Sequence, residues 1–102
     1  MTYTVTFTET FQKWLSSFKP KDRLARQLVV ARIRNMEDGH FGQTRSLGEG
    51  VSESKINYGP GYWLYYTIRD LEVVILLVGG DKRTQEADIQ KAKRLLKNME
   101  VL

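Results

Sequence analysis

The chain has 102 residues, a formal net charge of +4 and no cysteine. This length suits one domain and is too short for two, so we expect a single domain over residues 1–102. The absence of cysteine excludes disulfides and thiolate metal sites, and with one histidine we expect neither a metal centre nor a cofactor.

The first third of the chain predicts one strand followed by two helices. Residues 2–8 alternate threonines with apolar side chains, which is the period of two of a strand. Residues 9–18 carry apolar side chains at helical spacing, and Pro20 ends that helix. A second helix is predicted over residues 22–36, with Gly39 placed to end it.

The rest of the chain predicts a strand meander and a final helix. A glycine-rich loop with a short strand at residues 44–47 leads into strands at residues 51–57, 62–69 and 72–79. Their short connections favour antiparallel pairing. Gly79 and Gly80 are interpreted as turn residues, and Thr84 as the N-cap of the last helix.

This order of elements predicts an α+β fold, in which a twisted antiparallel sheet packs against two N-terminal helices and one C-terminal helix. The longest apolar run, residues 73–78, is far shorter than the roughly 20 residues of a membrane span. The first residues also lack the basic and apolar regions of a signal peptide. We therefore expect a soluble, cytoplasmic protein without membrane contact.

Three stretches carry a more specific pattern: residues 41–48 (FGQTRSLG), 51–66 (VSESKINYGPGYWLYY) and 76–89 (LLVGGDKRTQEADI). Together they resemble the phage-type HigB killer-protein branch of the RelE/ParE toxin superfamily. That branch carries segments like G-V-S-E-L-R-I and G-P-G-Y-R-V-Y, and a closing G-G-D-K-S-T-Q-x-x-D-I-x-x-A. The resemblance covers nearly the whole chain in the same order.

The resemblance implies the toxin of a type II toxin–antitoxin module. The resemblance further implies a metal-independent mRNA interferase, an endoribonuclease that cleaves messenger RNA on the ribosome and inhibits translation. The expected partners are ribosome, mRNA and a cognate antitoxin, often a helix-turn-helix protein. Operator DNA would be contacted only through that antitoxin, and the surplus positive charge favours phosphate-bearing partners in general.

Two departures from the family pattern bear on catalysis. Lys82 matches the family lysine, and Lys55 keeps the charge of a family arginine without its bidentate fork. Trp63 stands where the family has an arginine, and an indole can stack on a base but cannot neutralise a phosphate. One electrostatic donor is worth roughly 10²–10³ in rate, so we expect an attenuated or inactive toxin unless other residues compensate. Ser54 also replaces an apolar residue that should pack inward.

Strand alternation assigns the candidate site to one face of the sheet. If the apolar residues of the two middle strands face the helices, their polar and aromatic neighbours share an open face, with two cations arriving at its rim from the last turn. The expected catalytic residues are Lys55, Lys82 and Tyr65, and the expected substrate contacts are Glu53, Trp63, Arg83 and Gln85.

Each assignment has a simpler alternative. The three cations could be solvated surface charges, Tyr65 is better explained as a packed strand tyrosine, and Glu53 could pair with a neighbouring cation. The fold alone does not choose a target. A ParE-like gyrase inhibitor and a degenerate toxin that only binds its antitoxin therefore stay open; Trp63 argues against cleavage and Lys82 for it.

Overall fold

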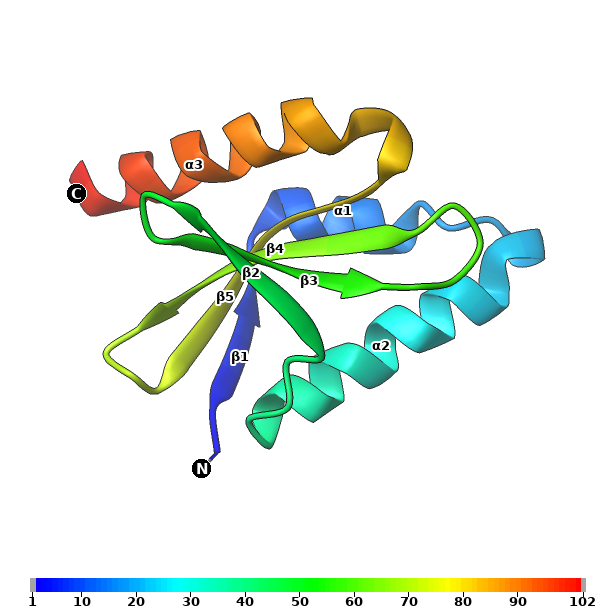
Figure 1. Cartoon of the computed structure of the whole chain (residues 1–102), viewed down its shortest axis with the longest axis horizontal. Helices are drawn as coiled ribbons and strands as arrows, with labels where there is room; N and C mark the ends of the chain where they lie inside the picture. The colour runs from blue at the N-terminus through cyan, green and yellow to red at the C-terminus, as the bar shows by residue number, and fades with distance from the viewer. Residues whose placement is uncertain (1, 102) are drawn as a thin grey trace.

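The computed structural model describes residues 2–101, which form one sheet with helices on both faces (Figure 1). The strands are β1 (Thr4–Phe7), β2 (Gln43–Gly48), β3 (Val51–Ile56), β4 (Tyr62–Arg69) and β5 (Val73–Asp81). The helices are α1 (Glu9–Ser16), α2 (Arg23–Glu37) and α3 (Gln85–Val101), with short 3₁₀ turns η1 (Pro20–Asp22) and η2 (Lys82–Thr84). The predicted α+β class and order of elements are confirmed.

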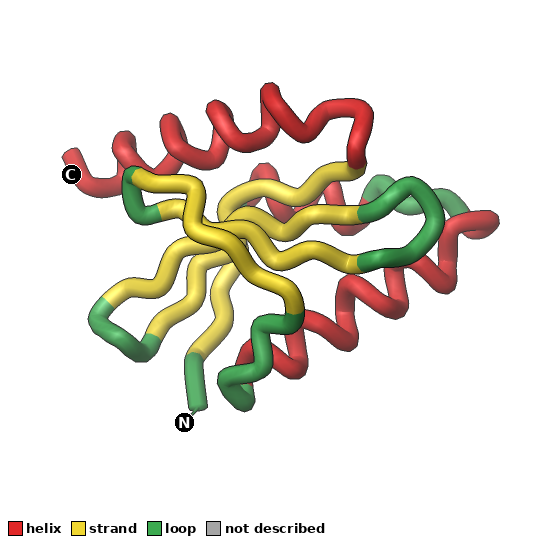
Figure 2. The backbone as a smooth tube through the Cα atoms, in the orientation of Figure 1, coloured by secondary structure: helices red, strands yellow, loops and turns green. Residues whose placement is uncertain are grey.

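The sheet is mixed, and the prediction of a purely antiparallel sheet is wrong in this respect. Its strand order is β1-β5-β4-β3-β2, and β2 to β5 form the expected antiparallel meander (Figure 2). The first strand instead pairs with β5 in parallel, with Thr4 opposite Val73. The chain leaves β1 through two helices and re-enters the sheet at the opposite edge, so the position beside β5 stays free for β1. Alternation in a sequence reports a strand but not its direction.

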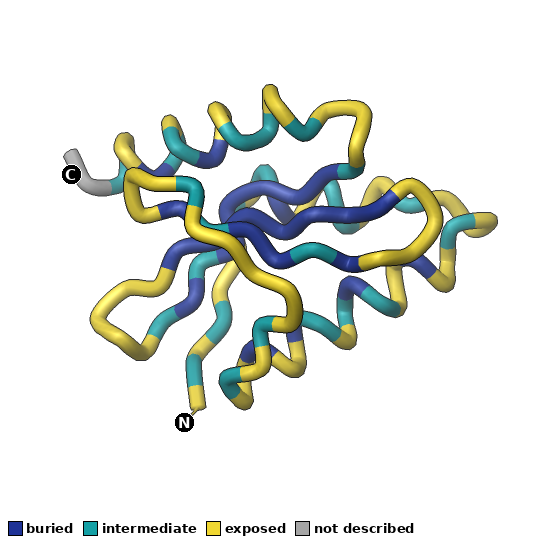
Figure 3. Tube along the Cα trace, viewed as in Figure 1, coloured by how far each residue is buried: buried dark blue, intermediate teal, exposed yellow. Residues whose placement is uncertain are grey.

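The helices α1 and α2 cover one face of the sheet and enclose most of the core. Phe11, Val29 and Met36 from these helices are fully buried against Leu64 and Leu76 of the sheet. Apolar side chains of the central strands are removed from water here, which is the main favourable contribution to folding. In Figure 3 the buried stretches accordingly follow β4 and β5 through the centre of the molecule.

The opposite face is partly covered by α3, which buries Trp63 and Tyr65, so the expectation that these two residues lie on an open face is wrong. Ala92 and Leu96 of α3 pack on Trp63, Tyr65 and their neighbours. The apolar stripe of this helix has to bury itself against something, and with α1 and α2 on one face only the other face remains. No helix within residues 2–101 is long and apolar enough to cross a membrane.

Gly79 and Gly80 lie inside β5 rather than in a turn, which corrects a second prediction. A Cβ atom on Gly79 would collide with the ring of Trp14, and one on Gly80 would collide with the Asp88 carboxylate. Both glycines therefore allow neighbouring helices to approach the strand closely. The turn itself is η2, where the Asp81 carboxylate accepts a hydrogen bond from the Arg83 backbone at 2.9 Å.

Candidate functional site

Two rows of side chains lie on the face of the sheet that α3 partly covers. Cross-strand partners in an antiparallel sheet point to the same face, so the register defines the rows directly. They run across β2, β3 and β4, and consist of Gln43, Lys55 and Trp63 in one row and Arg45, Glu53 and Tyr65 in the other.

Two adjoining hollows open beside these rows, with volumes of about 350 and 370 Å³. Lys55, Trp63 and Gln85 line both of them. Arg45 and Glu53 line the first hollow, and Lys82 lines the second. We call the two hollows together the Lys55 groove.

Lys55 and Lys82 line the same hollow of this groove, although 26 residues lie between them in the sequence. Lys55 is carried by β3, and Lys82 by the turn η2 at the end of β5. Gln85, the first residue of α3, adds a side-chain amide to the same groove. With Trp63 and Glu53, the structure therefore brings together five of the seven residues that the sequence predicted for the site.

Trp63 supports Lys55 from below. The Lys55 ammonium lies 5.3 Å from the centre of the Trp63 ring, within the range of a cation–π interaction. Only 6% of Trp63 is exposed, because the residue belongs to the cluster beneath α3. Its predicted role as an open stacking platform for a base does not fit this burial. The more exposed Tyr58 lines the second hollow instead.

A buried polar network anchors the backbone of Lys55 from the opposite face. Arg32 of α2 donates from Nη1 to the Lys55 carbonyl at 2.9 Å and to Ser54 Oγ at 2.7 Å. Ser54 Oγ in turn donates to the Phe41 carbonyl at 2.7 Å. Burial lowers the pKa of the Arg32 guanidinium. Ser54 therefore does pack inward, and its hydroxyl is satisfied there by Arg32 and Phe41.

Tyr65 is fully buried beneath α3, so its predicted position on an open catalytic face is wrong. Its hydroxyl has no hydrogen-bond partner among the described residues. Burial, with the nearby charges of Asp88 and Glu53, raises the pKa of Tyr65. The Tyr65 side chain does not line the Lys55 groove, so it cannot contact a substrate held there.

Glu53 is only 7% exposed, and its Oε2 lies 3.4 Å from Nε of Arg45. The alternative that Glu53 pairs with a neighbouring cation is therefore confirmed. Arg45 itself was missed among the site residues. The short strand predicted at residues 44–47 held the necessary signal, because alternation along it places Arg45 on one defined face.

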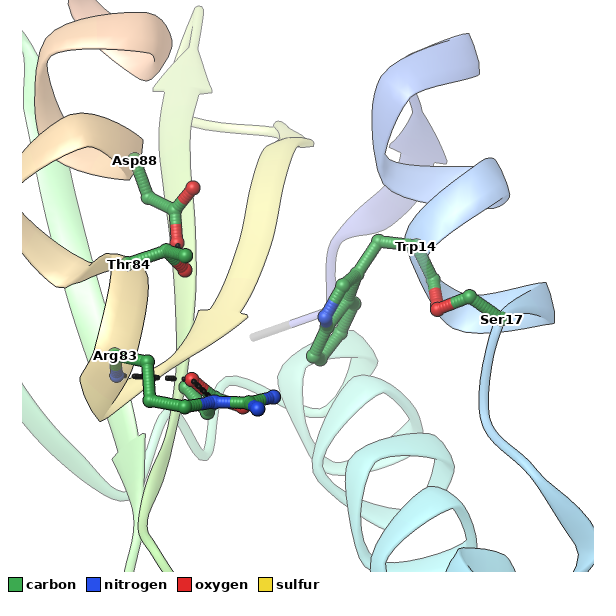
Figure 4. Close-up of polar contacts among 6 residues, drawn as sticks. Trp14, Ser17, Arg83, Thr84 and Asp88 are labelled. Atoms are coloured by element: carbon green, nitrogen blue, oxygen red, sulfur yellow. Dashed lines mark hydrogen bonds and ion pairs between the residues drawn. The ribbon is translucent and has the colours of Figure 1, made fainter.

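Arg83 lies outside the Lys55 groove, so it is not grouped with the other predicted site residues that line the groove. It lines a different hollow of about 540 Å³, together with Ser17 and Tyr62. Its Nη2 donates to Oδ2 of Asp81 at 2.8 Å, and this pairing lowers the pKa of Asp81. In Figure 4 the Arg83 side chain points away from Thr84 and Asp88 and toward the side of α1 that bears Trp14 and Ser17.

Comparison with known proteins gives one sequence relative and several structural ones. An uncharacterized protein of Haemophilus influenzae is 40% identical over 99 residues, which cover 97% of this chain and 98% of the relative. The two chains therefore belong to one family. No protein-family model matches the chain.

Solved structures share the fold. A double arginine-to-alanine mutant of the Escherichia coli toxin RelE in the free state superposes with a TM-score of 0.69 at 20% identity, covering 92% of this chain and 98% of that one. The toxin–antitoxin complex RelBE2 of Mycobacterium tuberculosis gives 0.59 at 25% identity, covering 80% and 100%. A conserved hypothetical protein of Helicobacter pylori gives 0.54 at 26% identity, covering 81% and 97%.

Proposed function

We propose that the chain is a member of the RelE/ParE superfamily, the toxin of a type II toxin–antitoxin module that cleaves messenger RNA on the ribosome. The observation that carries the proposal is the convergence of Lys55 and Lys82 in one groove, with Gln85 lining both hollows. The HigB branch, suggested by the sequence motifs, is the part of the superfamily that we favour.

The groove suits the chemistry of RNA cleavage without a metal. Attack of a 2′-hydroxyl on the adjacent phosphate builds negative charge on a pentavalent phosphorus. Fixed cations stabilise that charge most effectively when they are already in place before the reaction. Lys55 meets this condition, because Arg32 holds its carbonyl and Trp63 lies beneath its ammonium.

The proposed partner in the cytoplasm is a cognate antitoxin, which we expect to carry a helix-turn-helix domain and to make all contacts with operator DNA. Support comes from the RelBE2 structure, which is a toxin–antitoxin complex. The ribosome and its mRNA are the proposed targets of the free toxin. The formal charge of +4 favours association with RNA of any sequence.

The deciding experiment is a cleavage assay on mRNA bound to ribosomes, with the wild-type chain and the Lys55→Ala and Lys82→Ala variants. We expect each variant to lose roughly 10²–10³-fold in rate, as for removal of one electrostatic donor. Lys13→Ala is the matched control, because Lys13 is exposed on α1 and outside the groove. It should cleave like the wild type. Intact mRNA at saturating wild-type protein would refute the cleavage activity.

A toxin that binds without cleaving is the second candidate, and the composition of the groove favours it. Among the described residues that line the groove there is no histidine, and the single carboxylate, Glu53, is already paired. Tight antitoxin binding with intact mRNA would support this reading. Inhibition of DNA supercoiling by gyrase would instead support a ParE-like target.

A further inference from the structure

Arg45 brings a guanidinium to the Lys55 groove from the edge strand β2. It is the only arginine among the described residues that line the groove, and 65% of its side chain is exposed. The register places Arg45 opposite Glu53 and Gln43 opposite Lys55, so Arg45 and Lys55 are diagonal neighbours. Diagonal neighbours are about 7–8 Å apart, within reach of long side chains. One phosphate can therefore contact both cations.

The Arg45 guanidinium is held in a way that leaves its outer edge available. The ion pair with Glu53 is formed through Nε, at 3.4 Å. Neither of the two terminal nitrogens of Arg45, Nη1 and Nη2, is needed for this ion pair. Their planar arrangement matches two phosphate oxygens, which an ammonium group cannot do.

The buried position of Glu53 is energetically unfavourable for a carboxylate. The side chain is buried, and its Oε1 has no hydrogen-bond partner among residues 2–101. An ionised carboxylate with an unpaired buried oxygen costs free energy. Tyr65, which lies opposite Glu53 on the neighbouring strand β4, also has an unpaired hydroxyl. Among the residues that the structure describes, the ion pair with Arg45 is the salt bridge that Glu53 makes.

We propose that Arg45 is a phosphate-binding residue of the Lys55 groove, and that Glu53 is a positioning residue that fixes its guanidinium. The inference rests on the proposed function and adds Arg45, from β2, as a third cation beside Lys55 and Lys82. Lys55 and Arg45 then hold one phosphate of a single-stranded RNA from two sides, and Lys82 contacts the strand in the adjoining hollow.

The first test measures binding of a short single-stranded RNA by fluorescence anisotropy at several salt concentrations. Arg45→Ala should weaken binding about tenfold and reduce the slope of log K against log salt by about 0.7, the contribution of one phosphate contact. Arg69→Ala is the matched control, because it removes an exposed arginine from the far end of β4. It should leave the slope unchanged. Equal effects of the two variants would mean that only overall charge matters, and would overturn the role of Arg45.

The second test separates positioning from simple electrostatics. Glu53→Gln removes a negative charge beside the groove, so electrostatics alone predicts tighter RNA binding. Loss of positioning predicts the opposite: about threefold weaker binding, and slower cleavage wherever the wild type cleaves. In the Arg45→Ala background the same substitution should no longer weaken binding, because there is no guanidinium left to position. Weakening of the same size in both backgrounds would overturn the role of Glu53.

Urea unfolding of each variant shows that it is folded before binding is compared. If the wild type binds RNA but Arg45→Ala behaves like Arg69→Ala, the inference fails and the proposed function stands. If the wild type neither binds nor cleaves RNA, the proposed function fails and the inference fails with it.

Discussion

At the scale of single residues, Lys55 shows how backbone and side chain can be fixed by different parts of the fold. Its carbonyl accepts a hydrogen bond from Arg32 on one face of the sheet, and its ammonium lies over Trp63 on the other. The sequence predicts that Lys55 lies on a strand facing the site. It could not predict Arg32, because that guanidinium comes from a helix 23 positions earlier.

Substitution of Ser54 tests the hydrogen-bond network that holds the Lys55 backbone. Ser54→Ala removes the hydroxyl that accepts from Arg32 and donates to the Phe41 carbonyl. The buried groups lose a partner, so we expect the free energy of unfolding to fall by about 1–3 kcal/mol, measured by urea denaturation. Ser46→Ala, at an exposed position on neighbouring β2, is the control and should change it by less than about 0.5 kcal/mol. Similar effects at both positions would contradict the buried network.

At the scale of elements, the end of β5 is shaped by two helices that approach it from opposite sides. The Trp14 ring of α1 lies against Gly79, and the Asp88 carboxylate of α3 lies against Gly80. Alternate residues of a strand face opposite sides, so two consecutive glycines serve two different helices. The strand then leads directly into η2, which carries Lys82 into the groove.

The two glycines should respond differently to substitution. Gly79→Ala places a methyl group within the partly buried Trp14 ring, and we expect a loss of about 1–3 kcal/mol in the free energy of unfolding. Gly80→Ala meets the end of the Asp88 side chain, which can rotate away, so its cost should be smaller. Urea denaturation of both variants measures the difference. A larger cost at Gly80 than at Gly79 would show that the Trp14 contact does not limit this position.

Elements were more predictable than their arrangement. The strands predicted at residues 44–47, 51–57, 62–69 and 72–79 all form, and none of their ends is shifted by more than two residues. The parallel pairing of β1 and the position of α3 over Trp63 and Tyr65 were not foreseen. Periodicity reports which face of an element is apolar, but not which other element covers it. For the same reason the sequence predicted Tyr65 in the site, although α3 covers it.

At the scale of the whole molecule, the two helical layers cover the two faces of the sheet to different extents. The layer of α1 and α2 encloses the larger core cluster, and α3 covers only part of the second face. The Lys55 groove lies beside the first turn of α3, since Gln85 lines both of its hollows. A rigid sheet thus carries the candidate site on strands and a tight turn, which suits a site that depends on fixed charges.

Burial of three tyrosines on the central strand β4 also predicts how the stability of the whole molecule depends on pH. Burial raises the pKa of Tyr62, Tyr65 and Tyr66 above the value of about 10 for a free tyrosine. Above about pH 10 the unfolded chain loses these protons while the folded protein keeps them. The unfolded state then binds fewer protons, so the free energy of unfolding falls as pH rises, by up to roughly 1.4 kcal/mol per pH unit for each such tyrosine.

The Tyr65→Phe variant isolates the contribution of Tyr65 to the pH dependence of the free energy of unfolding. The variant removes a hydroxyl that is buried and unpaired, so its free energy of unfolding at neutral pH should match or exceed that of the wild type by up to about 1 kcal/mol. Between about pH 9 and 11 its stability should fall less steeply than that of the wild type, because one titrating group is gone. Tyr58→Phe, at an exposed position, should leave the wild-type steepness unchanged. Urea denaturation across this range measures all three proteins, and equal steepness for wild type and Tyr65→Phe would show that Tyr65 is not held neutral beneath α3.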